Sequence, residues 1–256
     1  MSSIEPSKSQ YAQIADLLRS RIADGTYVKG SALPSEPELA AELRVSRVTI
    51  NKAVGLLRAT GLVKVKRGLG TYVATLSKID RHASERFAVR DRGAGAGDVE
   101  IRSLGLQPRT DYGYVGPIGA PSAVAEALGI MAGTQTLLRS RALFADDEPT
   151  QLADSYYLWD MAKDSVLVQP DVGAGGSYAR LADLGAAPVR FTEAVTVRMP
   201  DAAEQRKLDL DSGQPVFEII HVAYDAADRP VSVTVHVMSG HLWTLHYAWA
   251  DRVSPS

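Results

Sequence analysis

The stretch between Glu42 and Asp80 contains no acidic residue, although it carries eight lysines and arginines. Residues 1–80 hold 12 Lys and Arg against 7 Asp and Glu, whereas the remaining residues hold 16 against 23, so the two parts of the chain have opposite net charge. Such a segment attracts polyanions, because each Lys or Arg near a phosphate releases condensed counterions. The pattern favours a nucleic-acid partner for the N-terminal part, and a solvated basic face is the alternative that charge alone leaves open.

Three helices are predicted in this N-terminal part. Apolar residues at helical spacing predict a first helix over residues 11–24. Ser35 followed by Glu38 has the pattern of a capping box and predicts the start of a second helix. Ser46 can cap a third helix that ends near residue 60.

The third helix has two different faces. On a helical wheel one side of the helix is apolar, with Ile50, Ala53, Val54 and Leu57. The other side carries Val48, Asn51, Lys52 and Gly55, with Arg47 and Arg58 on the flank. Arg47 could bond a guanine edge with two hydrogen bonds, Asn51 could do the same with adenine, and Lys52 could neutralise a phosphate. The short side chain of Thr49 would permit close approach. We therefore expect one face to pack and the other to enter a major groove.

A β-hairpin is predicted directly after this helix. The alternating runs 62–66 and 71–73 flank Arg67-Gly68-Leu69-Gly70, a cationic and glycine-rich tip. The glycines would let the backbone approach the sugar-phosphate, and the cations, with Lys66, would supply the attraction. As a nucleotide-binding loop the pattern is weak, because no Gly-Lys-Ser/Thr sequence opens a following helix. The hairpin is interpreted as a DNA-binding wing.

This order of elements resembles the DNA-binding domain of the GntR family of regulators. The segments that carry the resemblance are Leu33-Pro34-Ser35-Glu36, Val45-Ser46-Arg47-Val48-Thr49-Ile50-Asn51-Lys52, Gly61-Leu62-Val63 and Arg67-Gly68-Leu69-Gly70-Thr71-Tyr72-Val73. The predicted DNA-binding residues are Ser35, Arg47, Thr49, Asn51, Lys52, Lys66, Arg67, Gly68 and Gly70. Pro37 and Asn51 depart from the arginines of many members, so the operator sequence does not follow from the resemblance.

The rest of the chain alternates strand-like and helix-like segments. Strands are expected at residues 111–118, 136–144, 151–159, 189–199, 216–224 and 231–238, and short helices at 122–128, 177–184 and 201–208. Turn-forming residues at 146–149 and 225–230 join two pairs of strands as hairpins. These features predict an α+β architecture, a mostly antiparallel sheet with helices packed on it.

This second region resembles the UTRA ligand-sensing domain of the HutC subfamily, whose fold is similar to that of chorismate lyase. The segments that carry the resemblance are residues 137–157, 175–181, 198–201 and 224–230. The resemblance implies an effector pocket at one end of the sheet, and a homodimer formed largely through this domain. We therefore expect a winged helix-turn-helix domain at residues 8–75, a linker at 76–97 and a UTRA-like domain at 98–251.

Two arginines are candidates for holding an anionic effector. Arg139 and Arg141 are two apart on a predicted strand, so they project from one face and repel each other unless an anion or carboxylate balances them. In the family these positions commonly bind the phosphate or carboxylate of the effector. A solvated outer face is the alternative.

Other candidates come from a glycine-rich turn and from the last long strand. Gly176 and Ser177 stand at the start of a short helix, where free backbone N–H groups can hold an anion. Tyr178 matches a family position that lines the pocket. Thr234 and His236 share the polar face of their strand, which either lines the pocket or meets solvent.

Several function classes are disfavoured. The chain has no cysteine, no run that approaches the roughly 18 apolar residues of a membrane span, and no apolar stretch at its start. Its histidines are scattered, without a catalytic or metal-binding pattern. We expect a cytoplasmic, ligand-responsive repressor that binds double-stranded DNA at a pseudo-palindromic operator, with no catalytic residues, metal or cofactor. A chorismate-lyase-like enzyme with a DNA-binding head and a ligand-independent DNA binder are the alternatives.

Overall fold

The computed structural model describes residues 8–66, 68–76, 78–83 and 96–249. The chain forms two units, one built from residues 1–77 and 211–214 and the other from residues 78–210 and 215–256. Arg67 and most of the predicted linker lie outside the described residues. Among the helices that the structure describes, none combines the length and the apolar character needed to span a bilayer.

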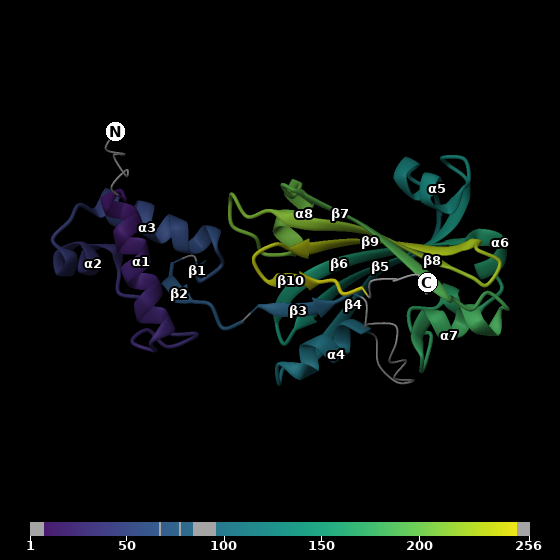
Figure 1. The fold of residues 1–256 in the computed structure, drawn as a ribbon, viewed down its shortest axis with the longest axis horizontal. Helices are drawn as coiled ribbons and strands as arrows, with labels where there is room; N and C mark the ends of the chain where they lie inside the picture. The colour runs from purple at the N-terminus through teal and green to yellow at the C-terminus, as the bar shows by residue number, and fades with distance from the viewer. Residues whose placement is uncertain (1–7, 67, 77, 84–95, 250–256) are drawn as a thin grey trace, which may run out of the picture. The chain divides into compact units, whose positions relative to one another are not determined.

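The first unit consists of three helices followed by a hairpin (Figure 1). Its elements are α1 (Gln10–Ala23), α2 (Glu36–Leu43), α3 (Arg47–Ala59), β1 (Val63–Lys66) and β2 (Gly70–Val73). Both α1 and α2 pack against α3. The winged helix-turn-helix predicted from the sequence is therefore confirmed, and the expected boundaries of α1, α3 and both strands differ from the observed ones by one residue.

One apolar cluster holds this unit together. Its fully buried members include Leu18 of α1, Leu39 of α2 and Ile50 and Leu57 of α3. Burying one such side chain stabilises the fold by roughly 1.5–3 kcal/mol, so the cluster fixes which side of α3 turns inward. The buried side chains of α3 are those that the helical wheel placed on its inner side, namely Ile50, Ala53, Val54 and Leu57.

A tight turn sets the start of α3. Arg44 closes α2 in the left-handed backbone region, with φ of 53°. Ser46 then caps α3, because its Oγ accepts a hydrogen bond of 3.2 Å from the backbone N–H of Thr49. The cap places Arg47 at the first position of the helix, where its side chain is exposed.

The hairpin is anchored at one end and exposed at the other. β1 and β2 pair antiparallel, with Val63 opposite Val73 and Lys66 opposite Gly70. Val63 and Val73 belong to the apolar cluster, whereas the tip projects from it. Gly70 has φ of 112°, a conformation that glycine adopts without steric penalty and that other residues avoid.

The centre of the second unit is a six-stranded antiparallel sheet in the order β4-β5-β6-β9-β8-β7. Its strands are β4 (Pro108–Gly119), β5 (Gln135–Ala145), β6 (Glu148–Leu158), β7 (Arg190–Arg198), β8 (Val216–Tyr224) and β9 (Pro230–Ser239). The helices are α4 (Ala96–Ser103), α5 (Ser122–Leu128), α6 (Trp159–Ala162), η1 (Val166–Val168), α7 (Gly176–Asp183) and α8 (Ala202–Lys207). All six strands and all three helices expected from the sequence are present.

Helices cover both sides of this sheet (Figure 1). On one face Val124 of α5 shares an apolar cluster with Val233 of β9. On the opposite face Leu181 of α7 shares a second cluster with Leu137 of β5. We call this second side the α7 face. Because side chains alternate along a strand, Arg139 and Arg141 of β5 are also directed to the α7 face.

Described residues of the predicted linker form regular secondary structure. Residues Ile79–His82 form β3, which pairs in parallel with β10 (Trp243–His246), and α4 begins at Ala96. The rings of His82 and His246 stack with centroids 4.6 Å apart. Four residues are too few to show a periodicity, and the partner strand lies near the other end of the chain, so the sequence did not indicate this pairing.

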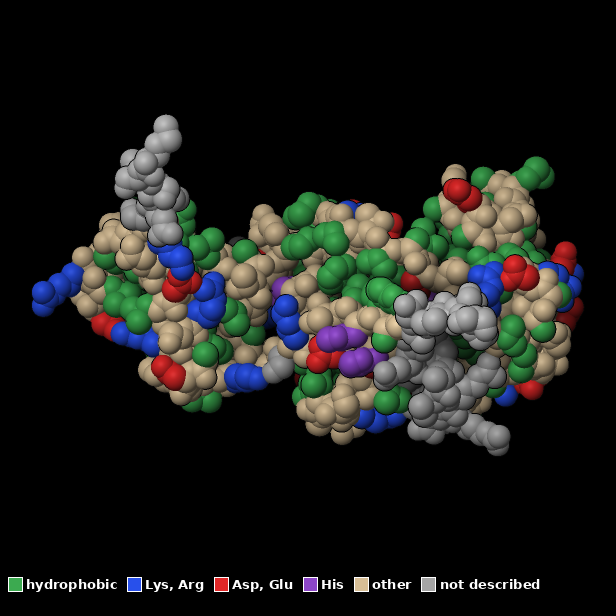
Figure 2. Space-filling view, viewed as in Figure 1, with side chains coloured by type: hydrophobic (Ala, Val, Ile, Leu, Met, Phe, Trp, Pro, Cys, Tyr) green, Lys and Arg blue, Asp and Glu red, His purple; other side chains and the backbone are tan. Residues whose placement is uncertain are grey.

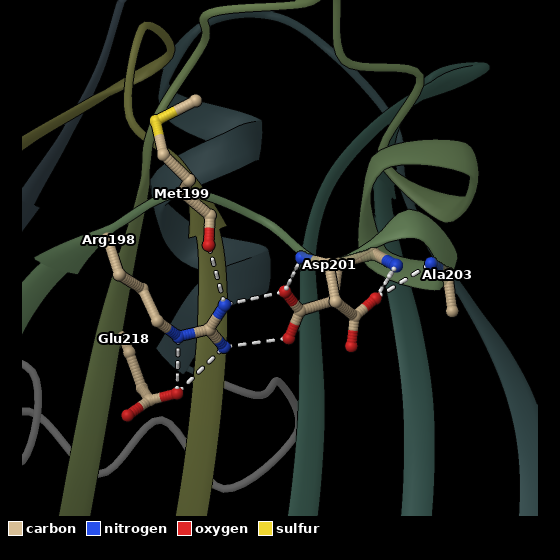
Figure 3. Close-up of polar contacts among 6 residues, drawn as sticks. Arg198, Met199, Asp201, Ala203 and Glu218 are labelled. Atoms are coloured by element: carbon tan, nitrogen blue, oxygen red, sulfur yellow. Dashed lines mark hydrogen bonds and ion pairs between the residues drawn. The ribbon is translucent and has the colours of Figure 1, made fainter.

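Arg198 at the end of β7 holds α8 in place (Figure 3). Its Nε donates to Glu218 of β8 at 2.7 Å, and its two terminal nitrogens donate to Glu204 of α8 at 2.6 and 2.7 Å. The hydrogen bonds from Arg198 lower the pKa of Glu204. Glu204 also accepts from the backbone N–H of Asp201 at 2.9 Å, and the Asp201 carboxylate caps α8 at Ala203, so this corner has a structural role.

Candidate DNA-binding and effector sites

The outer face of α3 carries the side chains predicted to bind DNA bases. Arg47, Asn51 and Lys52 are all exposed, and Arg47 makes no ion pair with any other described residue. Val48 stands beside them and is 65% exposed. Val48 was not among the predicted contacts, although the wheel placed it on this face, and an exposed valine suits the methyl group of thymine.

Asn51 is held by a neighbouring helix. Its Nδ2 donates a hydrogen bond of 2.8 Å to Oε1 of Glu36 on α2. A carboxylate only accepts, so the amide nitrogen must face Glu36, and the orientation of the Asn51 amide is fixed. The second N–H and the oxygen of the amide remain as the donor and acceptor that adenine requires.

Ser35 stands at the start of α2 and acts as its cap. Oε2 of Glu38 accepts hydrogen bonds of 2.7 Å from both the backbone N–H and the hydroxyl of Ser35. These hydrogen bonds from Ser35 lower the pKa of the Glu38 carboxyl. The capping role expected from the sequence is confirmed, and a DNA contact by the same serine stays a prediction.

The hairpin exposes a lysine side chain close to the glycine backbone of its tip. Lys66 is exposed, with its Nζ 4.6 Å from the centre of the Tyr72 ring. Gly68 and Gly70 are exposed at the tip, and Leu69 between them is 69% exposed. Lysine and arginine side chains are visible over the surface of this unit in Figure 2. The arrangement suits a hairpin that lies along a sugar-phosphate backbone.

In the second unit, one row of directly paired residues crosses the sheet on the α7 face. Arg139 of β5 pairs with Ser155 of β6, Ser155 with Thr234 of β9, Thr234 with His221 of β8, and His221 with Glu193 of β7. Polar and charged side chains thus occupy the middle of this face. Of the row, the sequence predicted Arg139 and Thr234, and it missed the other three, because strand order cannot be obtained from the alternation within one strand.

Arg141 joins this row through a hydrogen-bond chain. Its Nη2 donates to Oγ of Ser155 at 2.7 Å, and Ser155 Oγ lies 2.9 Å from Oγ1 of Thr234. The Nε of Arg141 is buried and has no hydrogen-bond partner among the described residues. The structure therefore brings the predicted Arg141 and Thr234 together, and the Nε–H of Arg141 has no acceptor among the described residues.

Arg139 is placed differently from the expectation that it pairs with Arg141 toward an anion. Its side chain is 1% exposed, and its terminal nitrogens donate to the carbonyl oxygens of Leu167, Gln169 and Pro170. Burial, together with the nearby charge of Arg141, lowers the pKa of this guanidinium. In this structure Arg139 holds η1 and the two residues that follow Val168.

The first turn of α7 brings the remaining candidates onto this face. Gly176 and Ser177 open the helix, and Tyr178 follows, one residue earlier than the start expected from the sequence. The hydroxyl of Tyr178 lies 3.0 Å from Nε2 of His221. The ring of His236 lies 6.3 Å from that of His221, so Tyr178 and His236 both contact a residue that was not among the predicted effector-binding residues.

The described residues contain no cluster of three or more histidine, cysteine or acidic side chains that could hold a metal ion. The two units supply two kinds of site instead, an exposed helix face with a basic hairpin and a polar row beneath α7. Together they define a transcription regulator with a sensing domain.

The family follows from comparison with known proteins. Residues 10–73 match the model described as bacterial regulatory proteins of the gntR family, and residues 103–242 match the UTRA domain. The chain belongs to the GntR family of transcription regulators, in the HutC subfamily that carries a C-terminal UTRA domain.

Relatives of known name agree with this membership. The HTH-type transcriptional regulator GgaR of Escherichia coli (strain K12) is 27% identical over 225 residues, which cover 88% of this chain and 85% of that protein. A probable fructoselysine utilization operon transcriptional repressor of the same strain is 25% identical and covers 88% of each chain. The relatives are transcription regulators and not enzymes, which confirms the expectation from the sequence.

Solved structures show the same fold. The crystal structure of PhnF from Mycobacterium smegmatis matches with a TM-score of 0.59 and 22% identity, covering 95% of this chain and all of that one. A putative GntR-family transcriptional regulator matches with a TM-score of 0.60 and 24% identity.

Proposed function

We propose that this regulator is a repressor that binds a pseudo-palindromic operator as a homodimer, in the cytoplasm where the DNA lies, and releases it when an anionic small molecule binds the α7 face. The observation that carries the proposal is the outer face of α3, where Arg47, Val48 and Asn51 are exposed although the same helix buries its other side completely. The repressor named among the relatives supports the direction of regulation.

Each part of the DNA-binding unit has a separate task. Arg47 and Asn51 present paired hydrogen-bonding groups to base edges in the major groove, and they supply sequence discrimination. Lys52, Lys66 and the glycines of the wing meet phosphates and sugars, and they supply affinity that depends on salt. Operator preference therefore depends on two or three side chains, whereas general DNA binding depends on the basic surface.

A homodimer follows from the size of the contact. One α3 helix spans only a few base pairs, whereas two such helices in successive major grooves bind half-sites about one helical turn apart. The symmetry of the protein is then repeated in the operator. We expect most of the dimer contact to lie in the UTRA domain, as the family resemblance implies.

The effector would bind where Arg141 meets the polar row. The unpartnered Nε of Arg141 offers a buried cationic donor, and buried donors in native proteins are normally satisfied by some partner. Ser155 and Thr234 stand next to it, and the first turn of α7 adds the backbone N–H group of Ser177 and the Tyr178 ring. The backbone N–H of Gly176 already donates to the carbonyl oxygen of Gly173 at 3.2 Å. A phosphate or carboxylate would satisfy Arg141, and the hydroxyls would bind the remainder of the ligand.

Release requires that effector and operator prefer different states of the dimer. If the effector weakens operator binding by a given factor, the operator weakens effector binding by the same factor. A coupling of about 1–3 kcal/mol is typical and corresponds to roughly 5- to 150-fold weaker operator binding.

The proposal is tested by selecting binding sites from genomic DNA with the purified full-length protein and measuring affinity for the selected duplex. Inorganic phosphate, sugar phosphates and carboxylates are then added one by one, and both operator affinity and thermal stability are recorded. We expect an inverted-repeat site and at least one compound that stabilises the protein and weakens operator binding. A protein that binds the site while no compound does either would be the ligand-independent DNA binder.

A further inference from the structure

A buried ion pair connects β3 to the edge of the large sheet. Arg81 of β3 has a side chain that is 1% exposed, and the side chain of Glu193 on β7 is 9% exposed. The two terminal nitrogens of Arg81 donate to the two oxygens of Glu193, one of them at 2.8 Å. This two-bond geometry fixes the direction of both side chains.

Glu193 also binds the strand that pairs with β3. The hydroxyl of Tyr247, which directly follows β10, donates to Oε2 of Glu193 at 3.0 Å. One carboxylate therefore holds both members of the two-stranded sheet formed by β3 and β10. Burial would raise the pKa of Glu193, but the hydrogen bonds from Arg81 and His221 outweigh it, and the pKa lies well below its ordinary value.

The same carboxylate reaches the candidate effector site on its other side. Oε1 of Glu193 lies 3.1 Å from Nδ1 of His221, and Nε2 of His221 lies 3.0 Å from the hydroxyl of Tyr178. An ionised carboxylate only accepts, so Nδ1–H of His221 donates to Glu193 and the other ring nitrogen is directed at Tyr178. The ring of Phe191 stacks on His221 and keeps it in this orientation.

We propose that Tyr178 and β3 are energetically coupled through His221 and Glu193, and that Glu193 is the positioning residue between them. The inference rests on the proposed function, which places Tyr178 in the effector site. β3 is the first element that follows the DNA-binding unit along the chain. A ligand that takes the Tyr178 hydroxyl as its partner alters the contact with His221, and Glu193 conveys the change to Arg81.

The attachment of β3 to the large sheet can be altered by such a change at Glu193. β3 and β10 have four residues each, so few backbone hydrogen bonds join them. Arg81 is buried, and a buried charge is costly unless its partner stays in place. A displaced Glu193 carboxylate therefore leaves a buried charge on β3 without its partner.

Hydrogen–deuterium exchange of the full-length protein, without DNA or ligand, tests the coupling. The exchange rates of residues 79–83 are compared in the wild type, Tyr178→Phe, His221→Phe and the double variant. We expect Tyr178→Phe alone to change these rates at least threefold. In a protein that already carries His221→Phe, adding Tyr178→Phe should leave the rates unchanged, because the contact between Tyr178 and His221 is already lost. Tyr224→Phe, which removes a hydroxyl on the opposite face of β8, is the matched control and should leave the rates unchanged.

Two results would overturn the inference. One is a Tyr178→Phe protein whose exchange at residues 79–83 equals that of the wild type. The other is a change in exchange on Tyr178→Phe that is equally large in the wild-type protein and in the His221→Phe protein. If His221→Phe does not fold, Glu193→Gln takes its place, because the amide keeps the shape and loses the charge. Since neither DNA nor effector enters the measurement, its outcome is separate from that of the operator-binding test.

Discussion

The amide nitrogen of Asn51 on α3 lies 2.8 Å from the Glu36 carboxylate on α2. The first helix of the helix-turn-helix pair therefore orients a side chain of the second, and it does so with a negative charge close to the expected path of the phosphates. Glu36 therefore has two opposing effects. It orients Asn51, which favours discrimination between bases, and its negative charge repels DNA, which lowers affinity for every duplex.

Substitution of the two residues should separate these effects. Asn51→Ala should remove about 1–3 kcal/mol of discrimination at one base pair. Glu36→Ala should reduce discrimination at that same base pair by a smaller amount and strengthen binding to every duplex. Affinities for the selected operator and for its single-base variants measure both quantities, and a Glu36→Ala protein with the specificity of the wild type would contradict the orienting role.

Loss of a wing cation should act on affinity alone. Lys66→Ala is expected to weaken binding to specific and random duplexes alike, and to reduce the slope of log K against log salt by about 1 for each wing that meets a phosphate. Titrations at several salt concentrations give the slope. Arg19→Ala removes the same charge from α1, and it should leave the slope unchanged; equal slopes for the two variants would argue against the wing contact.

Substitution of Arg139 should lower stability, whereas substitution of Arg141 should remove the response to the effector. Arg139→Met leaves one buried and two part-buried carbonyl contacts without their donor and should lower the free energy of unfolding by on the order of 3 kcal/mol. Arg141→Met should change stability by less than about 1 kcal/mol, because it loses one hydroxyl contact, and should abolish the response to the effector.

Urea unfolding and operator release measure these two quantities. The double variant should bind operator and fail to be released from it, provided that it folds. A normally released Arg141→Met protein would remove Arg141 from the effector site.

The Glu193 ion pair predicts a pH-dependent stability difference. Glu193→Gln should unfold more easily than the wild type at pH 7, by on the order of 3 kcal/mol, because Arg81 is left buried without its carboxylate. The folded pKa of Glu193 lies below the unfolded value, so its stabilisation is complete above about pH 5 and is lost progressively as the pH falls below about 4. Urea unfolding of both proteins at pH 7, 5, 4 and 3 checks this, and a difference that stays constant would contradict it.

Local patterns were sufficient for the DNA-binding unit. The buried and exposed sides of α3 follow from the spacing of Ile50, Ala53, Val54 and Leu57, and the cap at Ser46 follows from its residue type. The hairpin follows from two alternating runs around glycines. These elements are specified within a few residues of sequence, so a single chain was enough to predict them.

The missed features depend on contacts between distant segments. Arg139 was expected to face an anion with Arg141, but its partners are carbonyl oxygens of η1 and of the residues after it, which no spacing within β5 indicates. The Arg81–Glu193 pair joins a strand of the predicted linker to β7. Both are buried charges whose partners lie 28 or more residues away, and only the folded chain brings them together.

The proposed function depends on base reading by α3, which operator binding by an Arg47 variant tests without any effector. Fluorescence anisotropy compares the wild type, Arg47→Ala and the charge-matched Arg19→Ala on the selected operator at moderate salt. Arg47→Ala should cost about 1–3 kcal/mol, or roughly 5- to 150-fold in affinity, while Arg19→Ala binds like the wild type. Wild-type affinity in Arg47→Ala, or a wild-type protein that prefers no duplex over random competitor, would contradict the account.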